Sequence, residues 1–202
     1  MNRSFVMATG LFLFFLACGE KNRSSDADPK TATVEDTTQA ASQYFPVSAF
    51  LKGEIAYVDS LPVGIMKYTS RESRQDSGYI KIEEFHKLAQ EFLPSEMNDS
   101  QFVKEFQETS FMDKSTNIAT FMYGSKNEKI PVRRVDIVTA KGPIYDEVKS
   151  IYIEKNYQQG DSFFIKKLFW RPKRNFQIVT LKSKGSEKPQ NELIKVVWDN
   201  RE

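Results

Sequence analysis

The stretch SFFIKKLFW, residues 162–170, decides the fold of this chain. In an extended conformation it places large apolar side chains on one face at positions 164, 168 and 170 and on the other at 163, 165 and 169. Apolar side chains on both faces are typical of a strand that is covered on both sides. The stretch therefore predicts a central strand of a sheet, with helices covering one of its faces.

Short β-rich runs separated by turn signals surround this strand from residue 117 onward. Their spacing is typical of an antiparallel meander, and alternation is clear where Val135 and Ile137 oppose Arg134 and Asp136. We expect a sheet of five to seven strands. The candidates are Ile118–Tyr123, Val132–Thr139, Val148–Tyr157, Ser162–Trp170, Asn175–Lys182 and Leu193–Asp199.

Two helices are expected before the sheet. Apolar residues recur at helical spacing after Pro46, which predicts a helix over 46–59. The clearer helix runs from Ile82 to Leu93, with Glu83 in its first turn and Pro94 as its stop. Between the two, residues 64–69 resemble a strand and 70–78 a polar turn, whereas 100–109 suits either a helix or a strand.

Together these segments predict an α+β fold, in which two or three N-terminal helices pack on a C-terminal antiparallel meander. A curved half-barrel is one form such a sheet can take. The chain of 202 residues has room for one domain with a real core, over residues 45–202.

A spacer is expected before this domain. Residues 20–43 are rich in Ser, Thr, Asp, Ala and Lys, contain no aromatic residue and have Val34 as their one large aliphatic. Such a segment cannot bury enough apolar surface to fold. About 25 flexible residues reach roughly 25–30 Å, so residues 18–44 form a disordered tether in this prediction.

The N-terminal segment has the features of a secretory signal. Arg3 precedes an apolar core from Leu11 to Leu16, and Glu20 and Lys21 follow soon after. The apolar run is much shorter than the about 20 residues that a membrane span requires. We expect residues 1–17 to be cleaved.

The quartet Phe15-Leu16-Ala17-Cys18, followed by Gly19, resembles the lipobox of bacterial lipoproteins. The resemblance covers less than a tenth of the chain, and it departs from the usual pattern at Phe15, where leucine is common. It implies that Cys18 is acylated and becomes the first residue of the mature protein. Two or more acyl chains hold a protein stably at a bilayer.

The resemblance also implies a location. A lipid-anchored protein of this kind lies in the bacterial cell envelope. Gly19 rather than Asp after the cysteine resembles the pattern that is compatible with outer-membrane sorting. The periplasmic and the surface face both stay open.

Composition limits the partners. Cys18 is the only cysteine, so an exported domain must be held by packing without a disulfide. A formal net charge of +2 is too balanced to indicate nucleic acid as a partner. The 16 Phe, 8 Tyr and 2 Trp indicate a core of large rings or an apolar groove.

No residue pattern indicates a catalytic, cofactor or metal site. His86 is the only histidine, and neither a second histidine nor an H-E-x-x-H motif accompanies it. We interpret it as a boundary histidine that a neighbouring side chain satisfies. The glycines of a Gly-x-Ser-x-Gly motif are absent, which argues against a serine hydrolase.

Carboxylates are numerous, but no pair stands out as an acid and base. Charged positions that alternate along strands usually form the solvated face of a sheet. The candidates that remain are Glu105, Glu108, Asp113, Asp136, Asp146, Glu147, Glu154, Asp161 and Asp199.

A group of basic residues surrounds an aromatic hairpin. Lys166, Lys167, Arg171, Lys173 and Arg174 cluster in the sequence near Phe169, Trp170 and Phe176. Rings and cations together bind anionic polymers or lipid head groups in some proteins. The simpler interpretation is a solvated turn whose cations prevent edge pairing of the sheet.

Three functions are therefore considered. The first is a membrane-tethered envelope lipoprotein with a non-catalytic binding or scaffolding domain, whose partners are the bilayer, through acylated Cys18, and a protein or apolar ligand. The alternative is a carrier of lipid or other apolar molecules in an aromatic-lined half-barrel cavity. An enzyme of unknown class is the third.

Overall fold

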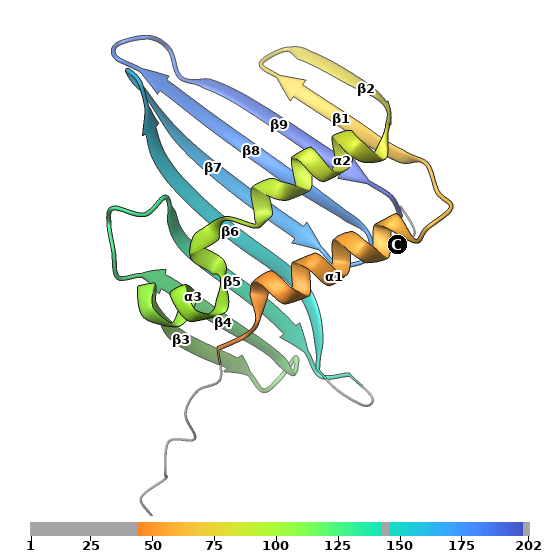
Figure 1. Ribbon diagram of the computed structural model, residues 1–202, viewed down its shortest axis with the longest axis vertical. Helices are drawn as coiled ribbons and strands as arrows, with labels where there is room; N and C mark the ends of the chain where they lie inside the picture. The colour runs from red at the N-terminus through yellow and green to blue at the C-terminus, as the bar shows by residue number, and fades with distance from the viewer. Residues whose placement is uncertain (1–43, 143–145, 200–202) are drawn as a thin grey trace, which may run out of the picture. The chain divides into compact units, whose positions relative to one another are not determined.

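The computed structural model describes residues 44–142 and 146–199, with the exception of the Asp99 side chain. The signal segment, Cys18 and most of the expected spacer lie outside the described residues. An α+β fold is confirmed: α-helices lie on an antiparallel sheet (Figure 1). Among the described residues, no helix is both long enough and apolar enough to span a membrane.

The helices largely follow the expected segments. Helix α1 spans Val47–Asp59 and begins after Pro46. Helix α2 spans Ile82–Ala89, and a 3₁₀ turn, η1, continues it over Gln90–Phe92, so the α-helix ends earlier than the predicted Leu93. A second 3₁₀ turn, η2 (Ser95–Met97), leads into helix α3 (Asp99–Glu105).

The sheet has nine strands in the part of the chain that the structure describes, so the expectation of five to seven was wrong. Six strands match the predicted runs: β4 (Ile118–Ser125), β5 (Val132–Ala140), β6 (Glu147–Gln159), β7 (Ser162–Arg171), β8 (Asn175–Lys184) and β9 (Gln190–Val197). The other three are β1 (Ile65–Arg71), β2 (Arg74–Ile80) and β3 (Phe106–Asp113).

Two of these three strands were missed for different reasons. Strand β2 was interpreted as a polar turn because nearly all of its side chains are exposed, which leaves no apolar alternation to detect. Strand β3 follows α3 without a break, because Phe102 is buried as a helical residue and Phe106 is buried as the first strand residue. The ambiguous segment 100–109 therefore contains both a helix and a strand.

The strand order is β2-β1-β9-β8-β7-β6-β5-β4-β3, and the sheet is not closed into a barrel. Strands β4 to β9 form the expected meander, each paired with its neighbour in sequence, and β3 extends it beyond β4. The β1–β2 hairpin pairs with β9 through contacts such as Met66 with Val197. The sheet is therefore not purely C-terminal, since its N-terminal hairpin extends it beyond the last strand.

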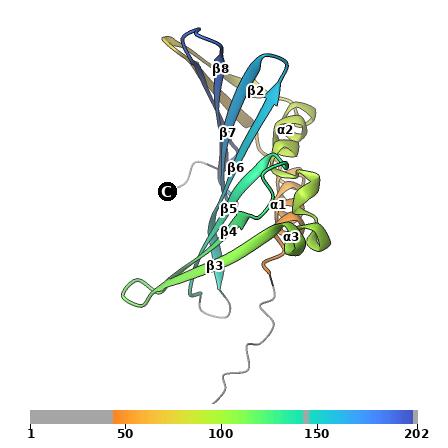
Figure 2. The same cartoon turned by 90° about the vertical axis from the view of Figure 1, so that its left-hand side faces the viewer.

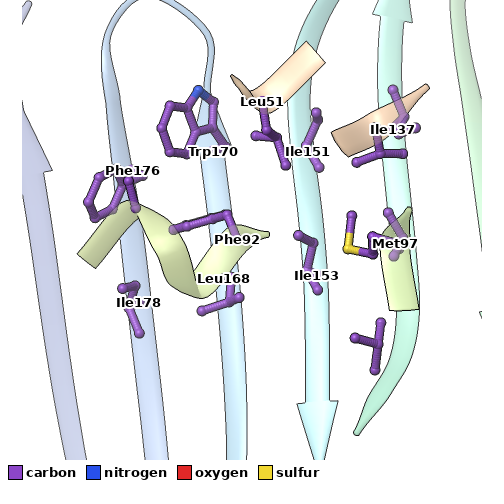
Figure 3. Packing of buried hydrophobic residues seen from close by; sticks show 14 of the residues in the cluster. Leu51, Phe92, Met97, Ile137, Ile151, Ile153, Leu168, Trp170, Phe176 and Ile178 are labelled. Atoms are coloured by element: carbon purple, nitrogen blue, oxygen red, sulfur yellow. The ribbon is translucent and has the colours of Figure 1, made fainter. Parts of the chain in front are cut away.

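The helices all lie on one face of the sheet (Figure 2). The core lies between them and the inward side chains of the strands, where Figure 3 shows Leu51 and Phe92 above Ile151, Leu168 and Trp170. The ring centroids of Phe92 and Trp170 are 5.0 Å apart. Burial of large rings is the main source of stability for a domain of this size.

No helix of the described residues lies on the opposite face of the sheet, and we call it the open face (Figure 2). Strand β7 was expected to be covered on both sides, and this is wrong. Leu168 and Trp170 are fully buried under the helices, whereas Phe163 and Phe169 on the other side are 45% and 36% exposed. The apolar residues of β7 thus pack in the core on one face of the sheet and are exposed at the surface on the other.

Candidate functional site

The open face presents rows of side chains that run across the strands. One row follows the pairing from Tyr152 on β6 through Phe169 and Gln177 to Lys195 on β9 and Tyr68 on β1. Tyr68 is 46% exposed. This row therefore combines three rings, an amide and a cation on a surface that no helix of the described residues covers.

Charge divides this face into two halves. On strands β7, β8, β9, β1 and β2 the register assigns only cations to the charged outward positions, namely Lys167, Arg171 and Lys195. On β5 and β6 the charges are mixed. Arg134 Nε lies 2.7 Å from Asp136 Oδ1, and Glu154 is the register partner of Arg134 on the neighbouring strand. The β7–β2 half is thus a cationic half.

A groove of about 900 Å³ lies over this cationic half. Its walls come from the β1–β2 hairpin, from the end of β9 and from the β7–β8 turn. The residues that line it are Tyr68, Thr69, Ser70, Gln75, Asp76, Ser77, Arg171, Arg174, Asn175, Leu193, Lys195, Val197 and Asp199. Its volume falls within the range of small-molecule sites.

Asn175 is the one residue of this groove that is both polar and buried, with 7% of its surface exposed. Its register partners are Arg171 and Val197, which places it on the open face. The side-chain Oδ1 is shielded from solvent and has no hydrogen-bond partner within the described residues. Buried polar atoms are normally paired, so this amide marks a place where a donor is missing.

A second hollow of about 650 Å³ lies at the turn of the β1–β2 hairpin, and Arg74, Phe164 and Lys182 are among the residues that line it. Lys182 Nζ lies 5.9 Å from the Phe164 ring, which itself stacks on Tyr157. Arg71 in this hollow is already paired with Glu192 at 2.5 Å. No buried, unpaired polar atom accompanies this hollow in the described part of the chain.

His86 is where the sequence placed it, at the edge of its helix. Its Nε2 lies 2.7 Å from Asp59 Oδ1 at the end of α1, and about half of its side chain is exposed. The described residues contain no group of three or more histidines, cysteines or carboxylates that could hold a metal ion. The pair links α1 to α2.

Six of the nine candidate carboxylates have separate partners, and a seventh, Asp199, lines the groove. Asp113 accepts hydrogen bonds from Ser115 and Thr116, which lower its pKa to about 2. The Lys149 ammonium donates to Glu147 and lowers the pKa of that carboxyl. The remaining pairs are Glu105 with Asn127, Asp136 with Arg134, Glu154 with Tyr152, and Asp161 with Lys184.

Burial governs the pKa of one tyrosine of the open face. Two causes raise the pKa of the Tyr152 phenol: the larger is its burial, and the smaller is its hydrogen bond to Glu154. The phenol therefore stays neutral at physiological pH and donates to the Glu154 carboxylate at 2.8 Å. The carboxylates of this half of the face are held in hydrogen bonds and ion pairs with their neighbours.

The basic residues around 166–174 do not form one site. Lys166 lies on the helix side, where its Nζ is 2.6 Å from Glu91 Oε1, and Lys155 Nζ is 2.8 Å from the other oxygen of Glu91. Lys167 and Arg171 point to the open face beside Phe169. Trp170 and Phe176 belong to the core.

Sequence reasoning missed three polar residues that the structure makes prominent. Glu54 is buried on the apolar stripe of α1, Glu91 lies between two lysines, and Asn175 lines the groove. A glutamate at helical spacing between Leu51 and Val58 was a detectable signal for Glu54. Asn175 had no such signal, because Arg171, Lys195 and Tyr68 approach it only in the folded sheet.

The space between the helices and the sheet bears on the carrier hypothesis. Phe85, Phe92, Trp170 and Phe176 are all fully buried there, and neighbouring rings lie 5.0–5.8 Å apart. The two grooves described above are instead lined by strand and turn residues on the surface. The described residues therefore give no support to an aromatic-lined interior cavity.

Comparison of the chain with protein-family models, with curated proteins and with solved structures finds no match. The function of this chain is therefore inferred from its own sequence and geometry.

Proposed function

We propose that this chain is a lipid-anchored envelope lipoprotein whose α+β domain is a non-catalytic binding domain, and that the open face is its binding surface. The lipobox-like quartet that ends at Cys18 supports the anchor. A flexible spacer over residues 18–44, as the sequence predicts, would let the domain turn either face toward a partner.

The observation that carries the proposal is the uncovered half-apolar face of a nine-stranded sheet. A sheet of this size ordinarily covers its apolar face with another layer. Here Phe163, Phe169 and Tyr68 are 45%, 36% and 46% exposed on a face that also carries Lys167 and Lys195. Exposed apolar surface rimmed by polar residues is typical of an interaction site.

The anchor is tested by Cys18→Ser in the full chain, expressed in a bacterium with its own signal. We expect the unchanged chain in the membrane fraction, with its N-terminal peptide carrying the mass of a lipid. The variant should lose that mass and leave the membrane fraction or stay unprocessed. Asn22→Ser, a nearby change that keeps the thiol, is the matched control, and equal membrane retention of Cys18→Ser would refute lipidation.

The binding surface is tested by photocrosslinking in the intact envelope. A benzophenone amino acid replaces Phe169 on the open face in one variant and Lys87, an exposed residue of α2, in another. We expect a discrete adduct from position 169 that position 87 does not give. Identical adducts from both positions, or none from 169, would contradict the assignment of the open face.

A further inference from the structure

We propose that the groove on the cationic half of the open face binds the phosphate-bearing head group of an anionic phospholipid. In this arrangement Arg171, Arg174 and Lys195 hold the phosphate, and a head-group hydroxyl donates a hydrogen bond to Asn175 Oδ1. The choice of a lipid as the source of the phosphate rests on the proposed function, because the anchor would keep the domain near a bilayer.

The first step is the groove's excess of positive charge. Three cations, Arg171, Arg174 and Lys195, line it against two carboxylates, Asp76 and Asp199, and none of the three cations forms an ion pair in the part of the chain that the structure describes. Arg171 and Lys195 stand on β7 and β9, two strand spacings apart and offset by two residues along the strands, which separates them by about 12 Å. Their long side chains can therefore approach one anion between them, and guanidinium and phosphate form strong charge-assisted hydrogen bonds.

The second step is the unpaired amide. Asn175 has only 7% of its surface exposed. It lies on β8, between the strands that carry Arg171 and Lys195. Because Oδ1 has no donor within the described residues, a bound hydroxyl would satisfy it. A fully deprotonated anion such as sulfate offers no donor, so the amide favours a ligand that carries a hydroxylated group, such as a glycerol phosphate.

The third step is the apolar surround. The ring of Tyr68 forms part of the groove wall, together with Leu193 and Val197, and exposed Phe169 is next to it on β7. Tyrosine and other amphipathic side chains are favoured at membrane–water interfaces. If the spacer predicted from the sequence is flexible, its reach of roughly 25–30 Å would keep such a surface near the bilayer in which Cys18 would be anchored.

The test uses the full chain in a neutral detergent, with glycerol 1-phosphate as the probe and calorimetry as the readout. We expect saturable binding that weakens as salt is raised. Arg171→Gln/Lys195→Gln should weaken it about tenfold or more, because two charged hydrogen bonds are lost. Lys87→Gln/Lys104→Gln, which removes the same charge from exposed positions of α2 and α3, should leave it unchanged.

A second variant tests the hydroxyl contact to Asn175 independently of the phosphate contacts. Asn175→Leu should weaken the binding of glycerol 1-phosphate about three- to tenfold while the weaker binding of sulfate, which has no donor, stays the same. The near-ultraviolet circular dichroism of Trp170 and Trp198 shows whether each variant is folded. If Asn175→Leu does not fold, a comparison of glycerol 1-phosphate with sulfate on the unchanged chain gives the same information, and equal affinities would overturn the role of Asn175.

The source of the phosphate is tested by competition. Adding phosphatidylglycerol to the detergent micelles should abolish the binding of glycerol 1-phosphate, and phosphatidylcholine should not. Binding without such competition would overturn the lipid and indicate a free phosphorylated polyol. No binding of the probe at all would overturn the site, while the membrane fractionation of Cys18→Ser would still decide the anchor independently.

Discussion

Glu54 connects a helix to a turn of the sheet through one carboxylate. Its Oε2 accepts a hydrogen bond from the Lys173 backbone N–H at 2.7 Å and one from Trp170 Nε1 at 3.4 Å. Lys173 has a φ of 61°, a left-handed conformation that costs free energy for a residue with a side chain. The buried carboxylate thus stabilises the β7–β8 turn, which presents Arg171 and Arg174 to the groove.

We expect Glu54→Ala to lower the free energy of unfolding by about 2 kcal/mol, because the buried Trp170 Nε1 and the partly buried Lys173 N–H lose their acceptor. Urea unfolding followed by tryptophan fluorescence measures this. Lys52→Ala, at an exposed position of the same helix, should change it by less than about 0.5 kcal/mol. Equal costs for the two variants would show that the turn does not depend on the carboxylate.

Glu91 links the η1 turn to β6 and β7 through Lys155 and Lys166. Burial alone would raise its pKa, but the hydrogen bonds and charges of the two lysines outweigh burial and hold the pKa below 4.5. The carboxylate therefore contributes stability above about pH 4.5, and this contribution is lost as the pH falls through the lower pKa of the folded state.

We expect Glu91→Gln to destabilise the protein by about 1–2 kcal/mol at pH 7 and by much less at pH 3. Unfolding free energies at both pH values measure the difference. Glu83→Gln, an exposed glutamate of α2, is the control and should show little change at either pH. A cost for Glu91→Gln that is the same at pH 7 and pH 3 would contradict an ionic role.

At the scale of the elements, α2 packs on the sheet through Phe85, which is fully buried and lies 5.7 Å from Trp198 and 5.8 Å from Phe176 between ring centroids. The apolar face that the sequence predicted for this helix is confirmed at Phe85. Phe85→Ala should cost about 3–5 kcal/mol in thermal or urea unfolding. Ile82→Ala, on the same helix but 36% exposed, should cost much less, and similar losses would mean that the cavity at Phe85 is refilled.

The β1–β2 hairpin is the least buried part of the sheet. Its outer strand β2 is exposed over Arg74–Tyr79 and has one partner strand, and the hairpin is attached to the rest of the sheet through β9. Exposed edge strands with few apolar contacts open at low free energy. Hydrogen-exchange mass spectrometry should show fast exchange in β2 and slow exchange in β7 and β8, and equal protection would contradict this view.

For the whole molecule, the chain has no cysteine besides Cys18, so packing alone holds the domain together. We expect dithiothreitol to leave the melting temperature unchanged within about 1 °C in differential scanning calorimetry, since a loss of even 1 kcal/mol would shift it by a few degrees. A larger shift would indicate a disulfide between copies through Cys18.

The sequence by itself determined the class of the fold, the six strands of the meander and the apolar faces of α1 and α2, because these are local patterns of period 2 and 3.6. It also suggested the anchor at Cys18. It did not reveal β2, whose exposed side chains carry no pattern, nor the helix-free face on which Phe163 and Phe169 lie. Only the tertiary structure decided the groove, because Tyr68 and Asn175 are more than 100 positions apart in the chain and become neighbours only when the N-terminal hairpin pairs with β9.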